Sequence, residues 1–155
     1  AVGAGTSPGR LEAVRRSPTV RLGAAHSPRG VAALLEAVTD EFSFSPLIGV
    51  VSMMADKDAE QMLRQLETVL ARVICTQNSS DRSMPAAELG EMAADLFGED
   101  RVSVIPSLDD ALEHAILLAD SAEGYEDAIG SGGVLVTGSV VTVGEARTLL
   151  GSSSA

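Results

Sequence analysis

Two side chains near the start of the chain have the chemistry to bind an anion: Arg10 and His26, which stand sixteen residues apart. A guanidinium combines a permanent charge with a fork of N–H donors that suits a phosphate. His26 directly precedes Ser27 and Pro28, a pair typical of a helix N-cap and first turn, and the amides at a helix N-terminus favour anions. A surface arginine and a structural histidine are the alternatives that these residue types leave open.

Charge is unevenly distributed along the chain. The net charge is −11, yet residues 1–30 contain five arginines against Glu12 alone, a balance of +4, so the remainder carries −15. Binding to nucleic acid needs clustered Lys and Arg, so the acidic body disfavours a nucleic-acid partner, and the basic start suits a small anionic ligand. On charge alone, a solvated arginine cluster is the simplest alternative.

Length and composition predict a single domain over residues 1–155, with an ordered core from 8 to 151 and 45% hydrophobic residues to build it. No apolar run approaches the roughly 20 residues of a membrane span, and the start lacks the apolar core of a signal peptide. We therefore expect no membrane partner and a cytoplasmic location. Cys75 lies in an apolar run, which favours a buried thiol over a nucleophile. The sequence shows no metal-ligand spacing.

Short β-rich runs alternate with amphipathic helical stretches, which predicts an α/β fold. Leu11–Arg15 and Thr19–Leu22 have the pattern of strands, and the linker between them is too short for a helical crossover, so we expect an antiparallel pair. The continuously apolar run Leu47–Val51 is typical of a parallel strand buried on both faces. After Ser27, apolar residues at helical spacing predict a helix: Val31, Leu34, Leu35 and Val38.

The same alternation continues to the end of the chain. Strands are predicted at 73–76, 102–105 and 134–136, and helices at 62–70, 85–97, 108–119 and 143–150. Ser107 with Asp110, and Thr142 with Glu145, have the spacing of capping boxes. Segment 120–133 is predicted to be a mobile loop, and residues 1–7 and 151–155 to be frayed ends. We expect a Rossmann-like open, mostly parallel sheet of about six strands, with helices on both faces and an antiparallel first strand.

In such sheets, ligands bind beyond the carboxyl ends of the strands. Polar groups that follow the predicted strands should therefore meet at one edge. Every α/β domain places loops there, so convergence alone does not identify a ligand. The segments concerned are Gly23–His26, Ser52–Asp56, Thr76–Arg82 and Thr137–Ser139.

Three runs carry a resemblance to a known family: Pro8-Gly9-Arg10-Leu11-Glu12, Ala24-Ala25-His26-Ser27-Pro28-Arg29-Gly30 and Gly138-Ser139. Together they resemble the C-terminal domain of folylpolyglutamate synthase/dihydrofolate synthase, within the Mur ligase superfamily. The resemblance extends from about Ser7 to Gly151. It implies an ATP-dependent ligase of folate biosynthesis and one-carbon metabolism. Such an enzyme phosphorylates a folate or dihydropteroate carboxylate and joins it to the glutamate amine in a cleft between two domains.

The resemblance also implies roles for single residues. Arg10 would contact the ATP phosphates, and His26, in the place of the histidine of an Asp-x-Ala-His-Asn-Pro pattern, would contact phosphate or the acyl-phosphate. The Asp of that pattern, which holds the ATP ribose, is Gly23 here, and its Asn is Ser27. Because glycine offers no side-chain acceptor, we expect weakened nucleotide binding, and Gly23→Asp should strengthen it.

Two further positions would contact the amino-acid substrate. Ser139 matches a Gly-Ser pair near the incoming glutamate. A purely structural role in the turn is an equal alternative. Arg82 sits where related ligases present an arginine to the amino-acid carboxylate. Asp56 and Asp58 also resemble a family run after the third strand, but capping the next helix is their expected role.

The chain has no Gly-rich run ending in Gly-Lys-Ser/Thr, so a phosphate-cradling P-loop is missing from it. In the family, the P-loop lies in the larger N-terminal domain, which would also provide most of the contacts to Mg²⁺. We therefore expect this chain alone to be inactive. A stand-alone, non-catalytic protein that acts through protein–protein contacts is the alternative, favoured by Gly23 and Ser27. A plain Rossmann-like nucleotide-binding module ranks last, because no Gly-x-Gly-x-x-Gly follows a strand.

Overall fold

Strands and helices alternate along the chain in the predicted order. The computed structural model describes residues 12–16, 19–41, 47–55, 58–120 and 132–153, with the side chains at 12–16, 40–41 and 151–153 left undescribed. The strands are β1 (Glu12–Arg16), β2 (Thr19–Gly23), β3 (Leu47–Val51), β4 (Arg72–Cys75), β5 (Val102–Val104) and β6 (Gly133–Thr137). The helices are α1 (Pro28–Glu41), α2 (Ala59–Glu67), α3 (Ala86–Phe97), the short 3-10 helix η2 (Glu99–Arg101), α4 (Leu108–Asp120) and α5 (Val140–Ser153).

The strands form one sheet in the order β1-β2-β6-β3-β4-β5. β1 pairs with β2 in the antiparallel direction, and every other neighbouring pair is parallel. β6 is the last strand along the chain but lies at the centre, where Val134 pairs with Val20 on one side and with Ile48 on the other. The predicted mostly parallel sheet with an antiparallel first strand is confirmed.

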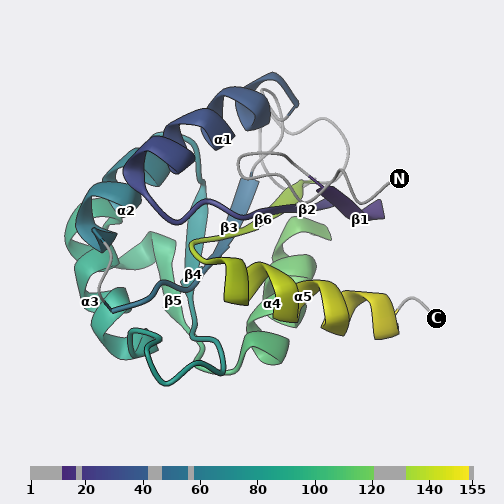
Figure 1. Ribbon diagram of the computed structural model, residues 1–155. Helices are drawn as coiled ribbons and strands as arrows, with labels where there is room; N and C mark the ends of the chain where they lie inside the picture. Colours follow the sequence, from purple (N-terminus) through teal and green to yellow (C-terminus); the bar gives the residue numbers. More distant parts are fainter. Residues whose placement is uncertain (1–11, 17–18, 42–46, 56–57, 121–131, 154–155) are drawn as a thin grey trace.

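Helices cover both faces of the sheet, as predicted (Figure 1). α1, α2 and α3 pack on one face, and α4 and α5 pack on the other. Successive strand residues point to opposite faces, so β3 contributes Leu47 and Val51 to the first core and Ile48 and Val50 to the second. This double burial explains the continuously apolar sequence of β3.

Helix α2 ends earlier than its apolar spacing predicted. Its C-cap is Thr68, so Leu70 lies beyond the helix, in the turn that leads to β4. Leu70 is nevertheless buried, because the missing side chain of Gly49 leaves room for it: a Cβ at Gly49 would lie 2.4 Å from Leu70 Cδ1. The helix starts with Asp58, whose Oδ1 accepts a hydrogen bond from the Gln61 amide at 3.4 Å. The expected capping role of Asp58 is confirmed.

Other predictions fall outside the described residues. Most of the expected mobile loop at 120–133 lies there, as do residues 1–7, residues 154–155 and Asp56. Residues 151–153, which were predicted to be frayed, instead continue helix α5. Among the helices that the structure describes, none has the length and apolar character needed to cross a bilayer.

Candidate functional site

Four loops meet at the carboxyl edge of the parallel strands. They follow β2, β3, β4 and β6, and each continues into a helix. β6 lies between β2 and β3 but sends its chain to α5 on one face, whereas its two neighbours send theirs to α1 and α2 on the other face (Figure 1). In open α/β sheets, ligands usually bind where neighbouring strands send their connections to opposite faces, which is the case at this edge.

The turn after β6 ties two of these loops together. Gly138 adopts a φ of 114°, and its amide donates a hydrogen bond to the Ala25 carbonyl at 3.1 Å. The Thr137 hydroxyl donates to the Gly23 carbonyl at 2.6 Å. The segment before His26 is therefore held by two hydrogen bonds, one from a backbone amide and one from a side-chain hydroxyl, to the segment before Ser139. The structure thus brings the loops of these two predicted site residues together.

His26 is exposed and precedes Ser27, the residue immediately before α1. Ser27 caps that helix, since its hydroxyl oxygen accepts a hydrogen bond from the Gly30 amide at 3.1 Å. The predicted N-cap is confirmed, and the serine that replaces the family's asparagine performs a local structural role. Arg29 is also exposed in the first helical turn. A helix N-terminus, an imidazole and a guanidinium thus lie on one exposed segment, which is a suitable environment for an anion.

Ser139 is placed at the sheet edge but faces inward. It is 2% exposed, and its hydroxyl oxygen accepts a hydrogen bond from the Val141 amide at 3.0 Å. Ser139 therefore caps α5. Its proposed contact with glutamate stays a prediction. The hydroxyl oxygen that would make this contact already accepts the hydrogen bond from the Val141 amide.

The predicted capping box of Thr142 and Glu145 is wrong. Helix α5 begins at Val140, so Thr142 is already inside its first turn. Both side chains instead reach the loop after β4. Of the capping box predicted for α4, the structure shows the hydrogen bond in which the Ser107 hydroxyl oxygen accepts from the Asp110 amide, at 3.3 Å.

Arg82 is exposed in the loop between β4 and α3. Its carbonyl accepts a hydrogen bond from the Ala55 amide at 2.7 Å, and its own amide donates to the Ser80 hydroxyl oxygen at 3.1 Å. An isolated bridge between Met54 and Ser83 adds to this contact. The backbone of Arg82 is therefore anchored to the loop after β3, at the same edge as His26 and Ser139.

A buried polar cluster that the sequence patterns did not predict lies beneath this edge. Asn78 is 7% exposed, and its side-chain amide donates to Thr142 Oγ1 at 3.0 Å and to Ser52 Oγ at 3.3 Å. These contacts join the loops after β3 and β4 to helix α5. In the sequence, Asn78 itself was an indication, because it is a polar residue three positions after a buried strand. Its partner Thr142, however, is 64 residues away.

Gly23 is buried at the end of β2, against helix α1. A Cβ at this position would lie 2.5 Å from Leu34 Cδ1 and 2.9 Å from Leu34 Cδ2. Leu34 is fully buried and has little room to move. A side chain at position 23 is thus directed into the core, and this geometry opposes the expectation that Gly23→Asp would simply restore a ribose contact.

We now expect Gly23→Asp to lower the free energy of unfolding by about 1–3 kcal/mol from overpacking, with a further loss because a carboxylate is brought against apolar groups. Urea denaturation would measure the change. Gly23→Ala serves as the matched control, since it adds the Cβ without the charge. If Leu34 is the obstacle, the double variant with Leu34→Ala should lose less stability than the two single changes added together. Strict additivity would contradict the steric explanation.

Two observations limit the chemistry of the described residues. Burial raises the pKa of the Cys75 thiol to about 12, so almost none of it is the reactive thiolate at neutral pH, and the expectation of a buried thiol is confirmed. Within the described ranges, no group of three or more His, Cys, Asp or Glu side chains could hold a metal ion.

Arg10 lies outside the described residues, and its phosphate contact remains a prediction.

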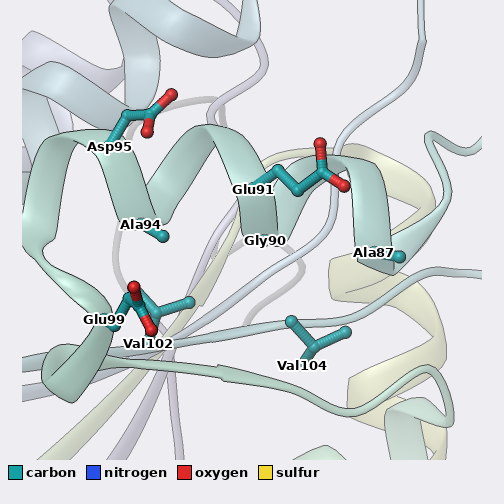
Figure 2. Close-up of a pocket in the computed structure, with 8 residues that line it drawn as sticks. All are labelled: Ala87, Gly90, Glu91, Ala94, Asp95, Glu99, Val102 and Val104. Carbon is teal, nitrogen blue, oxygen red and sulfur yellow. The ribbon is translucent and has the colours of Figure 1, made fainter.

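An open hollow of about 660 Å³ lies elsewhere, between α3 and the edge strand β5 (Figure 2). Its walls carry three carboxylates, those of Glu91, Asp95 and Glu99, above an apolar floor that includes Val102 and Val104. Acidic walls repel phosphates and carboxylates. This hollow is therefore a poor site for an anionic ligand, and the carboxyl edge of the strands is the better candidate.

The fold is an open α/β domain in which four loops, two of them carrying the exposed side chains of His26 and Arg82, meet at the carboxyl edge of the parallel strands. The family model described as "Mur ligase, glutamate ligase domain" matches residues 9–140. The chain therefore belongs to the family of Mur ligase glutamate ligase domains.

Particular relatives are close to the chain in both sequence and structure. It is 44% identical over 150 residues to the dihydrofolate synthase/folylpolyglutamate synthase of Mycobacterium tuberculosis, a match that covers 94% of this chain and 31% of the relative. The Bacillus subtilis protein of the same name is 30% identical over 92% of this chain and 30% of its own length. A crystal structure of the M. tuberculosis folylpolyglutamate synthase complexed with ADP and AMPPCP superposes with a TM-score of 0.86, at 44% identity over 94% of this chain and 33% of that one. The chain thus spans about a third of the length of these relatives.

Proposed function

We propose that this domain is the C-terminal domain of an ATP-dependent ligase that adds glutamate to folate or dihydropteroate. The observation that carries the proposal is the 44% identity over 94% of the chain with a relative named dihydrofolate synthase/folylpolyglutamate synthase. We take residues 1–155 as one such domain. An N-terminal P-loop domain would supply the opposite wall of the cleft, and ATP and folate as substrates favour a cytoplasmic location.

The proposed reaction proceeds in two steps. Transfer of the γ-phosphoryl group from ATP to the folate carboxylate gives an acyl-phosphate and ADP. The glutamate amine then attacks the acyl carbon, an amide bond forms, the C–O bond to phosphate breaks, and the amine gives up its proton. Each step concentrates negative charge on phosphoryl oxygens, which fixed cationic and N–H donors stabilise.

Within this scheme, the residues of the chain bind and orient. Arg10 and His26 would neutralise charge on the transferring phosphoryl group, helped by the N-terminal amides of α1. Arg82 would pair with a carboxylate of the incoming glutamate, and the turn at Ser139 would help to place that glutamate. The position of Gly23 offers no side-chain acceptor to a ribose. Exposure of His26 and Arg82 at one edge supports these roles.

Magnesium would shield the phosphate charges and orient the γ-phosphoryl group when bound. The described residues do not fit a Mg²⁺ site, because they include no cluster of carboxylates with the spacing of metal ligands. The metal is therefore assigned to the P-loop domain in this proposal, and this chain contributes no step through it.

The chain by itself should release no detectable ADP from ATP, glutamate and a folate, because the phosphate-cradling loop is absent from its sequence. A coupled assay for ADP would measure the release, run on the chain alone and on a protein that carries both this chain and a P-loop domain. Glutamate-dependent ADP release that appears only when both domains are present would support the proposal. Turnover by the purified chain alone would contradict it, and no turnover by the two-domain protein would favour a non-catalytic role.

A further inference from the structure

The loop formed by residues 77–83, called the Arg82 loop below, is held at two ends by different parts of the fold. Its second half is anchored to the loop after β3, as the Arg82 carbonyl and the bridge at Ser83 show. Its first half is anchored to helix α5, which the turn at Ser139 begins. The relative position of Arg82 and that turn therefore depends on both anchors.

Glu145 provides the outer contact between α5 and this loop. Its two carboxylate oxygens each lie 3.2 Å from the backbone nitrogen of Ser79, which donates to them, and the Ser79 hydroxyl donates to Oε2. Hydrogen bonds to an ionised acceptor are roughly twice as strong as neutral ones. A single side chain thus binds both donors of one residue that is 66 positions away.

Asn78 and Thr142 form the inner layer of the same contact. The Asn78 carbonyl oxygen Oδ1 accepts from the Ser80 amide at 2.9 Å, while its amide group donates to Thr142 and Ser52 as described above. Thr142 Oγ1 also donates to the Ser52 carbonyl at 3.3 Å. Each side chain both donates and accepts, so this buried layer favours a single arrangement.

We propose that Glu145 is a positioning residue that orients the Arg82 loop against α5, so that Arg82 meets a carboxylate of the incoming glutamate. The inference rests on the proposed function. A purely structural contact is a simpler role, but the route from Glu145 to Arg82 is short. Glu145 holds Ser79, and the next residue, Ser80, accepts from the Arg82 amide. Loss of the Glu145 contact therefore removes one of the two side-chain contacts that hold Ser79 and Ser80, while Asn78 Oδ1 still accepts from the Ser80 amide and the buried layer keeps the fold intact.

The test is steady-state kinetics on the two-domain ligase that contains this chain, with Glu145→Ala and Glu145→Gln compared with the parent. We expect Glu145→Ala to raise the KM for glutamate on the order of 10-fold, the scale of one charge-assisted hydrogen bond. The KM for ATP and kcat at saturating glutamate should change by less than about twofold, because the phosphate-binding residues are elsewhere. Glu145→Gln keeps one acceptor for the Ser79 amide and should recover part of the loss. Glu113→Ala, which removes the same charge from an exposed position on α4, should leave all three constants unchanged.

Three results would overturn the inference. A parent ligase that does not use glutamate would remove the proposed function and this inference with it. An active parent whose glutamate KM is unchanged in Glu145→Ala would refute the positioning role alone. The positioning role is also refuted if kcat, both KM values and the melting temperature of Glu145→Ala all change together without recovery in Glu145→Gln, since that pattern describes a structural contact.

Discussion

Gly138→Ala should lower the free energy of unfolding by about 3 kcal/mol or more, the combined scale of a non-glycine residue at positive φ and an overpacked contact. Gly138 has a φ of 114°, and a Cβ there would lie 2.2 Å from the Ser52 carbonyl oxygen. The obstacle is backbone at the end of a central strand, so it cannot rotate away as a side chain could. Urea denaturation of the 155-residue chain would measure the loss.

Gly98 offers a matched control for this prediction. Its φ is 91°, but a Cβ at Gly98 would meet nothing within 4 Å. Gly98→Ala should therefore show only the conformational penalty of about 1–3 kcal/mol for a non-glycine residue at positive φ with an extended ψ of 144°. The difference between the two variants isolates the contact with Ser52. Equal losses would mean that the strand end moves to accept the methyl group, and that the turn before Ser139 is less constrained than the structure indicates.

Arg10→Ala should lower kcat/KM of the two-domain ligase on the order of 100-fold or more, the scale seen when one preorganised donor to a charged transition state is removed. Arg10 belongs to the run that most resembles the ligase family, although it lies outside the described residues. If its guanidinium is in solvent, the same change should alter stability by no more than about 0.5 kcal/mol. Kinetics and thermal melting of the same preparation would give both quantities.

Arg64→Ala is the control for Arg10. Arg64 is exposed on α2 and pairs with Glu60 across one helical turn, so its loss removes the same charge without touching the carboxyl edge of the sheet. Its kinetic constants should match those of the parent. An Arg10→Ala variant that melts and turns over like the parent would exclude Arg10 from the site.

The local sequence was enough to predict the architecture. Continuous apolar runs indicated strands buried on both faces, and helical spacing indicated α1 through residues such as Val31 and Leu34, which the structure buries. Helix starts were also predictable at Ser27 and Asp58, because a cap is formed by residues only three positions apart. These features depend on contacts between near neighbours in the chain, which the order of residue types encodes directly.

Local pattern failed where a distant partner competes with a near one. Thr142 and Glu145 have the spacing of a capping box, but their hydrogen-bond partners Asn78 and Ser79 come from another loop. The apolar spacing of α2 continued to Leu70, but the helix stops at Glu67, and Leu70 fills the space above Gly49 instead. Apolar periodicity indicates that a residue is buried, but it does not indicate which element of the fold covers that residue.

The residue types alone predicted that polar groups gather at the carboxyl edge of the sheet, and the resemblance in a few short runs indicated the family. Only the tertiary structure decided how these groups are held. It placed β6 between β2 and β3, so that the turn at Gly138 lies against both Ala25 and Ser52. It also directed position 23 toward Leu34. The physical reason is that strand order and packing direction are set by contacts between residues far apart in the chain, which no local pattern contains.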